Sequence, residues 1–291
     1  MRVFLTGGTG FIGTHIRQYL ASNGHQVVAI TRHPMPDEDN ITWVTGGINN
    51  IDSLIDGMDG CHAVVHLVGI IREHGSVTFN SVHVQGTTNV VNAMRQLGIK
   101  QIIYISALDA AQKAPTAYLR SKWLAEEAVR GAGVDYVIFR PSIVFGPGDH
   151  FISLLANQLL HDPLIPIIGK GDYQFSPVNI TAVAEAITQA LLQQEKIGNQ
   201  VYELCGPESL TYVQLIEIIS DYLHKHKAKL FLPVWLVKIG IALAGLLHIP
   251  TPITASELTM LLHGSVCDSN NVYADLSIPR ITVSQGIKKY L

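Results

Sequence analysis

A tyrosine and a lysine stand four residues apart in the segment Tyr118-Leu119-Arg120-Ser121-Lys122. On a helix, two residues with this spacing share one face and lie one turn from each other. An ammonium group beside a phenol stabilises the phenolate and lowers the tyrosine pKa towards neutral pH. Tyr118 and Lys122 are therefore predicted to exchange a proton with a carbonyl or hydroxyl group. The alternative is structural, a half-buried tyrosine beside a solvated lysine.

Ser106 completes this candidate catalytic set. It ends a predicted strand, Gln101–Ser106, that precedes the tyrosine in the chain. Ligand sites of parallel sheets form at the carboxyl ends of the strands. The Ser106 hydroxyl is therefore predicted to hold the oxygen of the substrate.

The elements that must position these side chains follow a repeating order. Short β-branched runs alternate with longer segments of helical period, which predicts parallel βαβ units. The predicted class is α/β: a Rossmann-type doubly wound parallel sheet over residues 1–145, then a smaller, mostly helical cap over residues 146–291 that returns in part to the sheet. The predicted strands are Val3–Thr6, Gln26–Thr31, Thr42–Thr45, Ala63–Val68, Gln101–Ser106 and Asp135–Arg140. The predicted helices are Phe11–Ser22, Ile51–Met58, Val82–Leu97, Tyr118–Ala132, Phe151–His161, Ile180–Gln194 and Tyr212–Lys225.

A glycine-rich segment joins the first predicted strand to the first predicted helix. Glycines at this place permit a tight turn, close approach of the backbone to a pyrophosphate, and packing of the helix on the strand. The helix N-terminus adds free N–H groups and a partial positive charge. In this position the pattern indicates a dinucleotide site, with an ordinary strand-to-helix turn as the alternative. The candidate contacts are Gly7, Thr9, Gly10, Phe11, Ile12 and Gly13.

The residue after the second predicted strand bears on the cofactor. An acidic residue there holds the ribose hydroxyls of NAD, but this chain has Arg32 at that place. A guanidinium pairs with the 2′-phosphate of NADP, which an aspartate would repel. NADP(H) is therefore favoured and NAD(H) is the alternative, while a solvated surface cation is the structural interpretation of Arg32.

The composition excludes several classes of protein. The 291 residues carry 20 Lys and Arg against 23 Asp and Glu, a net charge of −3, whereas nucleic-acid binders show a basic excess. An apolar fraction of 47% beside a charged fraction of 15% indicates a large core and an apolar outer patch. None of the 13 histidines belongs to an H-E-x-x-H motif, so no metal is expected.

The cysteines and the amino terminus bear on the compartment. Cys61, Cys205 and Cys267 lack a C-x-x-C spacing and are expected to be unbridged in a reducing compartment. No signal-peptide pattern follows Met1. We therefore expect a cytoplasmic protein.

One apolar region, Leu230–Ile253, stands out in the second half of the chain. It is too interrupted to be expected to span a membrane. A helix buried in the cap or at a contact between subunits is the favoured interpretation. The alternative is a peripheral membrane contact or an opening for an apolar substrate, with Trp235 at the lipid headgroups. The interrupting residues are Pro233, Lys238, His248, Pro250 and Pro252.

The glycine loop, Ser106, Tyr118 and Lys122 together resemble the short-chain dehydrogenase/reductase superfamily. The glycine spacing and the segment Arg140–Gly148 are similar to its extended and atypical branch of NAD-dependent epimerases and dehydratases. Within that branch, four segments resemble the family of the 39 kDa accessory subunit of respiratory complex I: His66–Gly69, His83–Thr87, Ile105–Leu108 and Tyr202–Pro207.

The resemblance implies a nicotinamide dinucleotide along the carboxyl ends of the strands and hydride transfer to or from it. It assigns proton exchange to Tyr118, ribose binding and pKa lowering to Lys122, and orientation of a carbonyl to Ser106. Contacts along the cofactor would come from His66, Leu67, Val68, Gly69, Pro141 and Ile143.

Two functions follow from these observations. The first is an oxidoreductase or epimerase/dehydratase-type enzyme acting on a small-molecule substrate. Its oligomeric state is left open, with a homo-oligomer as one alternative because helices of such sheets often pair between subunits. The second is a non-catalytic NADP(H)-binding structural or assembly protein. The intact Tyr118 and Lys122 favour the enzyme, whereas the short segment between Ser106 and Tyr118 and the apolar stretch near Trp235 favour the assembly protein.

Overall fold

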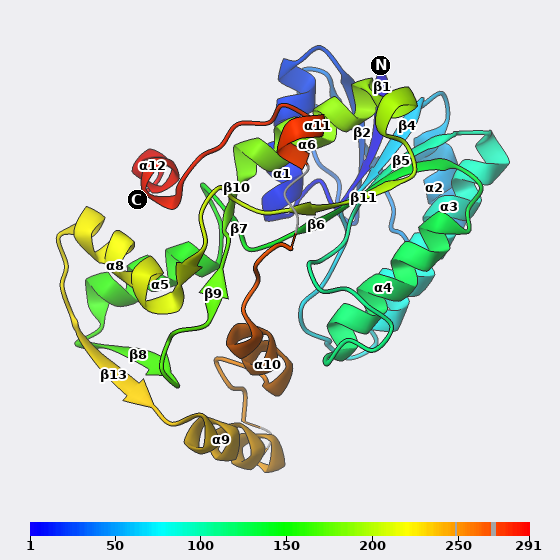
Figure 1. Cartoon of the computed structure of the whole chain (residues 1–291). Coiled ribbons are helices and arrows are strands. Elements are labelled where there is room, and N and C mark those ends of the chain that lie inside the picture. Colours follow the sequence, from blue (N-terminus) through cyan, green and yellow to red (C-terminus); the bar gives the residue numbers. More distant parts are fainter. Residues whose placement is uncertain (248, 269–271) are drawn as a thin grey trace. The chain divides into compact units, whose positions relative to one another are not determined.

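The computed structural model describes residues 1–247, 249–268 and 272–291, and the chain divides into two compact units (Figure 1). Unit 1 comprises Met1–Pro141, Ile180–Leu204 and Ser269–Pro279. Unit 2 comprises Ser142–Asn179, Cys205–Asp268 and Arg280–Leu291. Each unit is therefore assembled from segments that are separated in the sequence.

Unit 1 is built on a seven-stranded parallel sheet with the order β11-β6-β5-β4-β1-β2-β3. This is the doubly wound order of a Rossmann-type fold, so the predicted fold class is confirmed. Six of the strands arise from the predicted β-branched runs, and β11 joins from the later sequence. The strands are β1 (Arg2–Thr6), β2 (Gln26–Thr31), β3 (Ile41–Thr45), β4 (Ala63–His66), β5 (Gln101–Ile105), β6 (Asp135–Pro141) and β11 (Gln200–Leu204).

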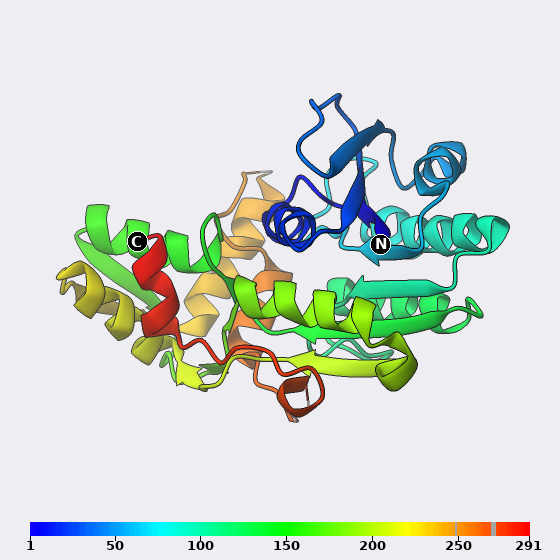
Figure 2. The same ribbon diagram turned by 90° about the horizontal axis from the view of Figure 1, so that it is seen from above.

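Helices cover both faces of this sheet (Figure 1, Figure 2). On one face α2 (Ile51–Met58), α3 (Gly86–Leu97) and α4 (Ala117–Arg130) enclose an apolar core with the strands. The other face carries α1 (Phe11–Ser22) and α6 (Ile180–Leu192), which contact each other. Strands covered in this way are apolar on both sides, which is why their sequences lack the alternation of a half-exposed strand. The short helices α7 (Gln194–Ile197) and α11 (Val272–Asp275) complete the unit.

Several helices have bounds that differ from the predicted ones. The predicted helix Val82–Leu97 starts earlier, and its first part, Asn80–Gln85, is a π-helix (η1) that leads into α3. A single widened turn leaves the apolar spacing nearly unchanged, so the sequence pattern does not reveal it. In unit 2, α8 (Tyr212–Leu223) ends where His224 adopts a left-handed conformation, with φ of 54°.

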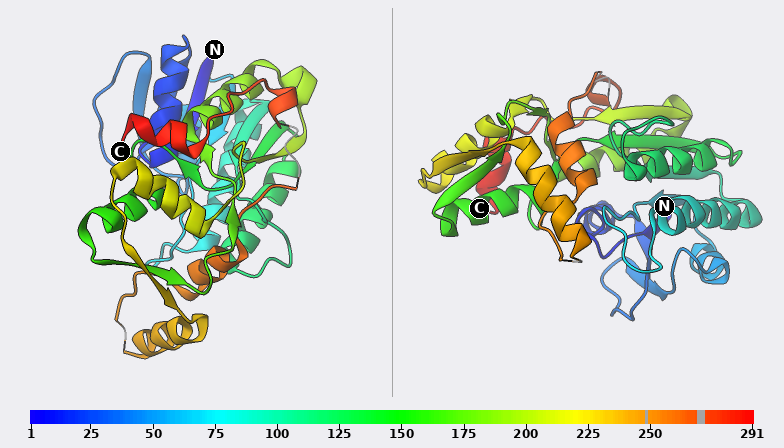
Figure 3. Two further views of the ribbon diagram at one scale, coloured as in Figure 1. Left: turned by 60° about the vertical axis from the view of Figure 1, so that its left-hand side comes forward. Right: turned by 90° about the horizontal axis from the view of Figure 1, so that it is seen from below.

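Unit 2 combines helices with three two-stranded sheets. The sheets pair β7 (Val144–Phe145) with β10 (Val178–Asn179), β8 (Leu164–Ile168) with β13 (Ala228–Leu232), and β9 (Gln174–Phe175) with β12 (Leu210–Thr211). Helices α5 (Phe151–His161) and α8 lie side by side (Figure 3) and supply much of the apolar core. The remaining elements are α9 (Val234–Leu246), α10 (Ala255–His263), α12 (Val283–Gly286) and the 3-10 helix η2 (Ile287–Lys289).

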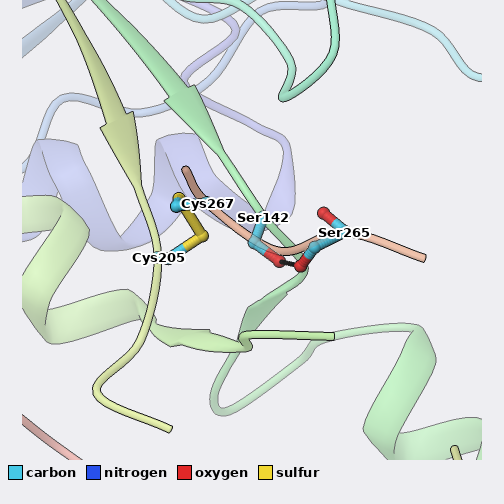
Figure 4. Close-up of a disulfide and its surroundings, with 4 residues drawn as sticks. All are labelled: Ser142, Cys205, Ser265 and Cys267. Atoms are coloured by element: carbon cyan, nitrogen blue, oxygen red, sulfur yellow. Dashed lines mark hydrogen bonds between the residues drawn. A yellow bond between two sulfur atoms is a disulfide. The ribbon is translucent and has the colours of Figure 1, made fainter. Parts of the chain in front are cut away.

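Within unit 2, a disulfide joins Cys205 to Cys267 (Figure 4). The expectation that all three cysteines are unbridged is therefore wrong. The two partners are separated by 62 positions, and nothing in local spacing marks a pair so far apart. The bridged segment is also held by its backbone, because the carbonyl of Ser265 accepts hydrogen bonds from Ser142 Oγ and from the Ser176 N–H, each at 2.8 Å. Cys61 is free, and burial raises its pKa to about 11.

The apolar region forms strand β13 and helix α9. No residue of α9 is buried, so the expectation of a helix buried in the cap is wrong. Trp235 is 63% exposed, and His248 lies outside the described residues. Among the described residues no helix has the length and apolar character needed to cross a bilayer.

Candidate functional site

The glycine loop is packed so tightly that side chains are excluded at two of its positions. Gly7 has a φ of +76°, and a Cβ there would lie 3.1 Å from the backbone of Leu67 and of Val68. A Cβ on Gly13 would lie 2.0 Å from the Gly7 carbonyl oxygen. Gly10 is the N-cap of α1 and offers no side-chain cap. The first N–H groups of α1, at Phe11 and Ile12, are therefore left to bind an anion.

The loop after β4 begins beside the glycine loop and is tied to β1. The Thr6 hydroxyl lies 2.6 Å from His66 Nδ1, and the Leu67 N–H donates to the same hydroxyl at 3.2 Å. His66 Nε2 lies 3.0 Å from the Thr87 hydroxyl. Burial lowers the pKa of His66 to about 3, so this histidine is neutral and orders the loop. Of the predicted contacts, Thr9 and Gly69 are exposed and Val68 is half-buried.

Lys122 lies at the other end of this loop. A Cβ on Gly69 would lie 3.9 Å from Lys122 Nζ. The ammonium donates a hydrogen bond to the Ile105 carbonyl at 2.6 Å and lies 4.5 Å from the centre of the Tyr104 ring. Lys122 is 3% exposed, and burial lowers its pKa to about 7. The structure thus brings the glycine loop, residues 66–69 and the lysine into one continuous path.

Tyr118 lies one turn before Lys122 on α4, as the spacing predicted, with the Thr116 hydroxyl capping the helix. Its half-buried ring is flanked by Phe79 and His83, with ring centres 5.9 and 5.7 Å away. Burial raises the pKa of Tyr118 to about 12. The predicted lowering of this pKa is therefore wrong for the chain by itself. The physical reason is that desolvation of the phenol dominates, while the neighbouring lysine is engaged by a main-chain carbonyl.

Ser106 follows β5 directly and is buried. Its N–H donates to the Phe139 carbonyl at 2.8 Å. Its hydroxyl has no hydrogen-bond partner among the described residues. A buried polar atom without a partner is costly, and a ligand oxygen at this place would satisfy it.

His83 was missed as a site residue, although it lies under the predicted tyrosine. Its Nε2 accepts a hydrogen bond from the Ile70 N–H at 3.0 Å, so the ring proton is on Nδ1. That proton is donated to Ser121 Oγ at 2.7 Å, and the Ser121 hydroxyl donates to the Tyr118 carbonyl at 2.6 Å. Burial lowers the pKa of His83 to about 3. The π-helix that carries His83 is a departure often found at functional sites.

A buried carboxylate, Glu126, was also missed. It is fully buried and lies one turn after Lys122 on α4. Arg140 of β6 donates two hydrogen bonds to it, at 2.8 and 2.6 Å, and Arg130 donates a third at 2.8 Å. Glu126 favours the charged form of Lys122. The repeat of Tyr118, Lys122, Glu126 and Arg130 at intervals of four was the signal that would have found this series.

The adenosine end of the predicted site holds an ion pair that the sequence did not reveal. Arg17 of α1 donates to the Gly8 carbonyl at 3.1 Å and to both oxygens of Glu38, at 2.6 and 2.9 Å. Its guanidinium carbon lies 5.2 Å from the centre of the Trp43 ring. Arg32 is exposed, and its side chain has no hydrogen bond or ion pair to a described residue. Glu38 is thus an acidic residue near the glycine loop, but it lies further along the loop after β2 and not directly after the strand.

The two remaining predicted contacts belong to different units. Pro141 ends β6 in unit 1, whereas Ile143 packs against the core of unit 2. Among the described residues no group of three or more His, Cys, Asp or Glu side chains is placed to hold a metal ion.

The match of residues 3–205 to the model of the NAD dependent epimerase/dehydratase family decides the family. The chain belongs to it. The matched residues include the glycine loop, Ser106, Tyr118 and Lys122. The predicted resemblance to this branch is confirmed.

Curated relatives support the narrower resemblance. NADH dehydrogenase [ubiquinone] 1 alpha subcomplex subunit 9, mitochondrial, from Arabidopsis thaliana is 30% identical over 238 residues, covering 78% of this chain and 59% of the relative. A ceramide reductase from Caulobacter vibrioides is 30% identical over 172 residues, covering 58% of this chain and 54% of the relative. The chain spans about three fifths of the length of the first relatives it matches.

Solved structures agree on the fold. The UDP-glucuronic acid 4-epimerase from Bacillus cereus in complex with NAD has a TM-score of 0.79 at 19% identity, covering 100% of this chain and 97% of the other. The dTDP-glucose 4,6-dehydratase from Bacillus anthracis in complex with NAD has a TM-score of 0.78 at 17% identity, covering 99% and 94%.

Proposed function

We propose that this chain binds a nicotinamide dinucleotide and uses it in an oxidoreductase or epimerase/dehydratase-type reaction on a small-molecule substrate. One observation carries the proposal. The backbone of Gly7 is packed against Leu67 and Val68, and Gly69 in turn lies beside Lys122. A single extended ligand lying along this path would meet an anion-binding helix end first and a titratable lysine last.

The residues along this path fit such a cofactor. The pyrophosphate would be held by the backbone of the glycine loop, where a side chain at Gly10 would fill the exposed space. The Arg32 guanidinium has no hydrogen bond or ion pair to a described residue and could bind a 2′-phosphate, which supports NADP(H) as the preferred form. Glu38 would oppose that phosphate if its charge were not matched by Arg17. The nicotinamide end would lie near Lys122.

When bound, the cofactor supplies or accepts a hydride. Tyr118 exchanges a proton with the substrate oxygen, and Ser106 holds the same oxygen through a hydroxyl that has no hydrogen-bond partner in the described part of the chain. Lys122 binds the ribose next to the nicotinamide. A protonated Lys122 one helical turn from the phenol favours the phenolate, which offsets the effect of burial on Tyr118. His83 and Ser121 hold the helix backbone at Tyr118 in place.

A binding titration tests the first part of the proposal. We expect NADPH and NADP⁺ to raise the melting temperature and to bind more tightly than NADH and NAD⁺. Arg32→Ala should remove the preference and leave NADH binding unchanged, because the 2′-phosphate alone distinguishes the two cofactors. Absence of binding by all four dinucleotides would overturn the proposal.

A second variant tests catalysis. Tyr118→Phe should bind NADPH as the unchanged chain does but lose at least a hundredfold in NADPH oxidation with a panel of aldehydes and ketones, since proton transfer contributes about that much. Lys122→Met should lose both binding and turnover. Equal turnover by Tyr118→Phe would remove the tyrosine from the mechanism.

A second candidate function is a non-catalytic, dinucleotide-binding assembly protein. It is supported by the relatives named as subunits of NADH dehydrogenase in Arabidopsis thaliana and Mus musculus. Under this function the dinucleotide stabilises the fold, no substrate is turned over, and Tyr118→Phe changes nothing measurable. A dinucleotide that binds and stabilises without oxidation by any substrate of the panel would favour it.

A further inference from the structure

Helix α9 is apolar on the side that faces solvent. Its half-buried residues mark the side turned towards the protein and recur with helical spacing: Val234, Val237, Ile241 and Ala244. The opposite side carries four large apolar residues with exposed fractions of 63%, 49%, 55% and 75%: Trp235, Ile239, Leu243 and Leu246. An ordinary surface helix is polar on this outer side, but Lys238 is the single charged residue in α9. The outer face is therefore built for an apolar environment.

The charge of the surrounding chain distinguishes between partners. The sequence from Tyr222 to Ser256 contains no aspartate or glutamate and four lysines: Lys225, Lys227, Lys229 and Lys238. Lys229 pairs with Glu217 at 3.0 Å, and the other three lysines have no ion pair to a described residue. The whole chain carries a net charge of −3, so the basic excess is local to this region.

A second copy of the chain fits this face poorly. An isologous contact would bring the same lysines of both copies together, and like charges facing each other across an interface are unfavourable. An anionic lipid surface instead attracts lysines and accepts an apolar helix face. The charge pattern therefore favours lipid.

The length of α9 settles how it would meet a bilayer. Its 13 residues extend about 20 Å at 1.5 Å per residue, less than the hydrocarbon core of about 30 Å. We propose that α9 lies in the plane of an anionic membrane surface and docks the protein there. The four exposed apolar residues of α9 enter the boundary between headgroups and acyl chains. The lysines without an ion pair to a described residue, Lys225, Lys227 and Lys238, contact lipid phosphates.

Flotation of the full chain with vesicles tests this proposal. Vesicles of phosphatidylcholine with phosphatidylglycerol should carry the protein at low salt and less at high salt, whereas phosphatidylcholine alone should carry little. Leu243→Asp should abolish flotation. The matched control is Leu192→Asp at the end of α6, where the leucine is 61% exposed, and it should float as the unchanged chain does. Both variants should melt at the temperature of the unchanged chain, because neither leucine is buried.

Two further measurements separate lipid from protein contacts. Lys225→Gln and Lys227→Gln should each lower partitioning about fivefold, the ratio given by about 1 kcal/mol for each basic residue. Fluorescence should shift to shorter wavelength on addition of the anionic vesicles, and Trp235→Phe should remove the shift. The proposal is overturned by absence of flotation with anionic vesicles, by flotation of Leu243→Asp, or by a dimer that Leu243→Asp dissociates without any lipid binding. None of these outcomes depends on dinucleotide binding.

Discussion

The ammonium of Lys122 donates a hydrogen bond to the carbonyl of Ile105, with Nζ 2.6 Å from the oxygen. This bond joins the lysine side chain of α4 to the carboxyl end of β5, next to Ser106. Because burial lowers its pKa to about 7, Lys122 changes charge near neutral pH. The charge at the centre of the candidate site is therefore sensitive both to pH and to any ligand that binds there.

The stability of the ligand-free chain should rise between pH 7 and pH 10 on account of this lysine. In the unfolded chain its pKa is near 10.4, so over this range the unfolded state binds more protons and stability rises with pH. The rise is at most about 1.4 kcal/mol for each pH unit. Lys122→Met should flatten it, whereas the exposed Lys113→Met should not. Urea unfolding at pH 7 and pH 9 measures the difference, and an unchanged slope in Lys122→Met would contradict the prediction.

His83 should make the chain lose stability on acidification. Its pKa is about 3 in the folded chain because of burial and near 6.5 in the unfolded chain. Stability therefore falls as the pH drops below 6.5, by up to about 1.4 kcal/mol per unit. His83→Gln should lose less stability between pH 7 and pH 5 than the unchanged chain. The control is His74→Gln, at an exposed histidine. If the unfolding free energy of His83→Gln changed with pH in the same way as that of the control, His83 would not be neutral.

Replacing Glu126 should lower the free energy of unfolding far more than replacing its neighbour Glu127, although both carboxylates pair with Arg130. Glu126 is fully buried between two arginines, while the side chain of Glu127 is 47% exposed. Removing one partner of a buried ion pair costs about 3–5 kcal/mol. Glu126→Ala should therefore lower the unfolding free energy by about that amount, and Glu127→Ala by less than about 1 kcal/mol. Equal losses in guanidinium unfolding would show that Glu126 is not the anchor of Arg140.

Two glycines of the same loop should respond differently to alanine. A Cβ on Gly13 meets the Gly7 carbonyl oxygen at 2.0 Å, whereas on Gly10 its nearest contact is an ordinary 3.5 Å. Gly13→Ala should destabilise the fold, and Gly10→Ala should keep the fold and lose dinucleotide binding. Gly240→Ala, in open space on α9, is the control and should be neutral or stabilising by up to about 1 kcal/mol. Thermal unfolding with and without NADPH distinguishes these results, and full NADPH binding by Gly10→Ala would place the ligand elsewhere.

Periodicity predicted the strands of the sheet and the placement of Tyr118 and Lys122 on one helix, because those features are local in sequence. The β-branched runs became strands of the central sheet, and the spacing of Tyr118 and Lys122 placed them one turn apart on α4. Each depends on residues within a few positions of one another. Such patterns are what single-sequence reasoning can detect.

The features that escaped prediction depend on distant residues or on desolvation. The Arg17–Glu38 pair joins α1 to the loop after β2, and Cys205 and Cys267 are 62 positions apart. The raised pKa of Tyr118 follows from burial, which the spacing of two side chains does not reveal. For α9, an apolar run looks the same in a core as on a surface, so only the fold shows that it is exposed.

The path of the chain between the two units has a consequence for synthesis on the ribosome. Unit 1 begins at Met1 but takes its edge strand β11 and helix α6 from Ile180–Leu204. Until those residues emerge, β6 presents an unpaired edge, and one face of the sheet lacks a helix. Unpaired edges of this kind invite pairing with other chains. The nascent chain is therefore most prone to aggregate after β6 has emerged and before β11 has emerged, and that is when a chaperone would protect it most.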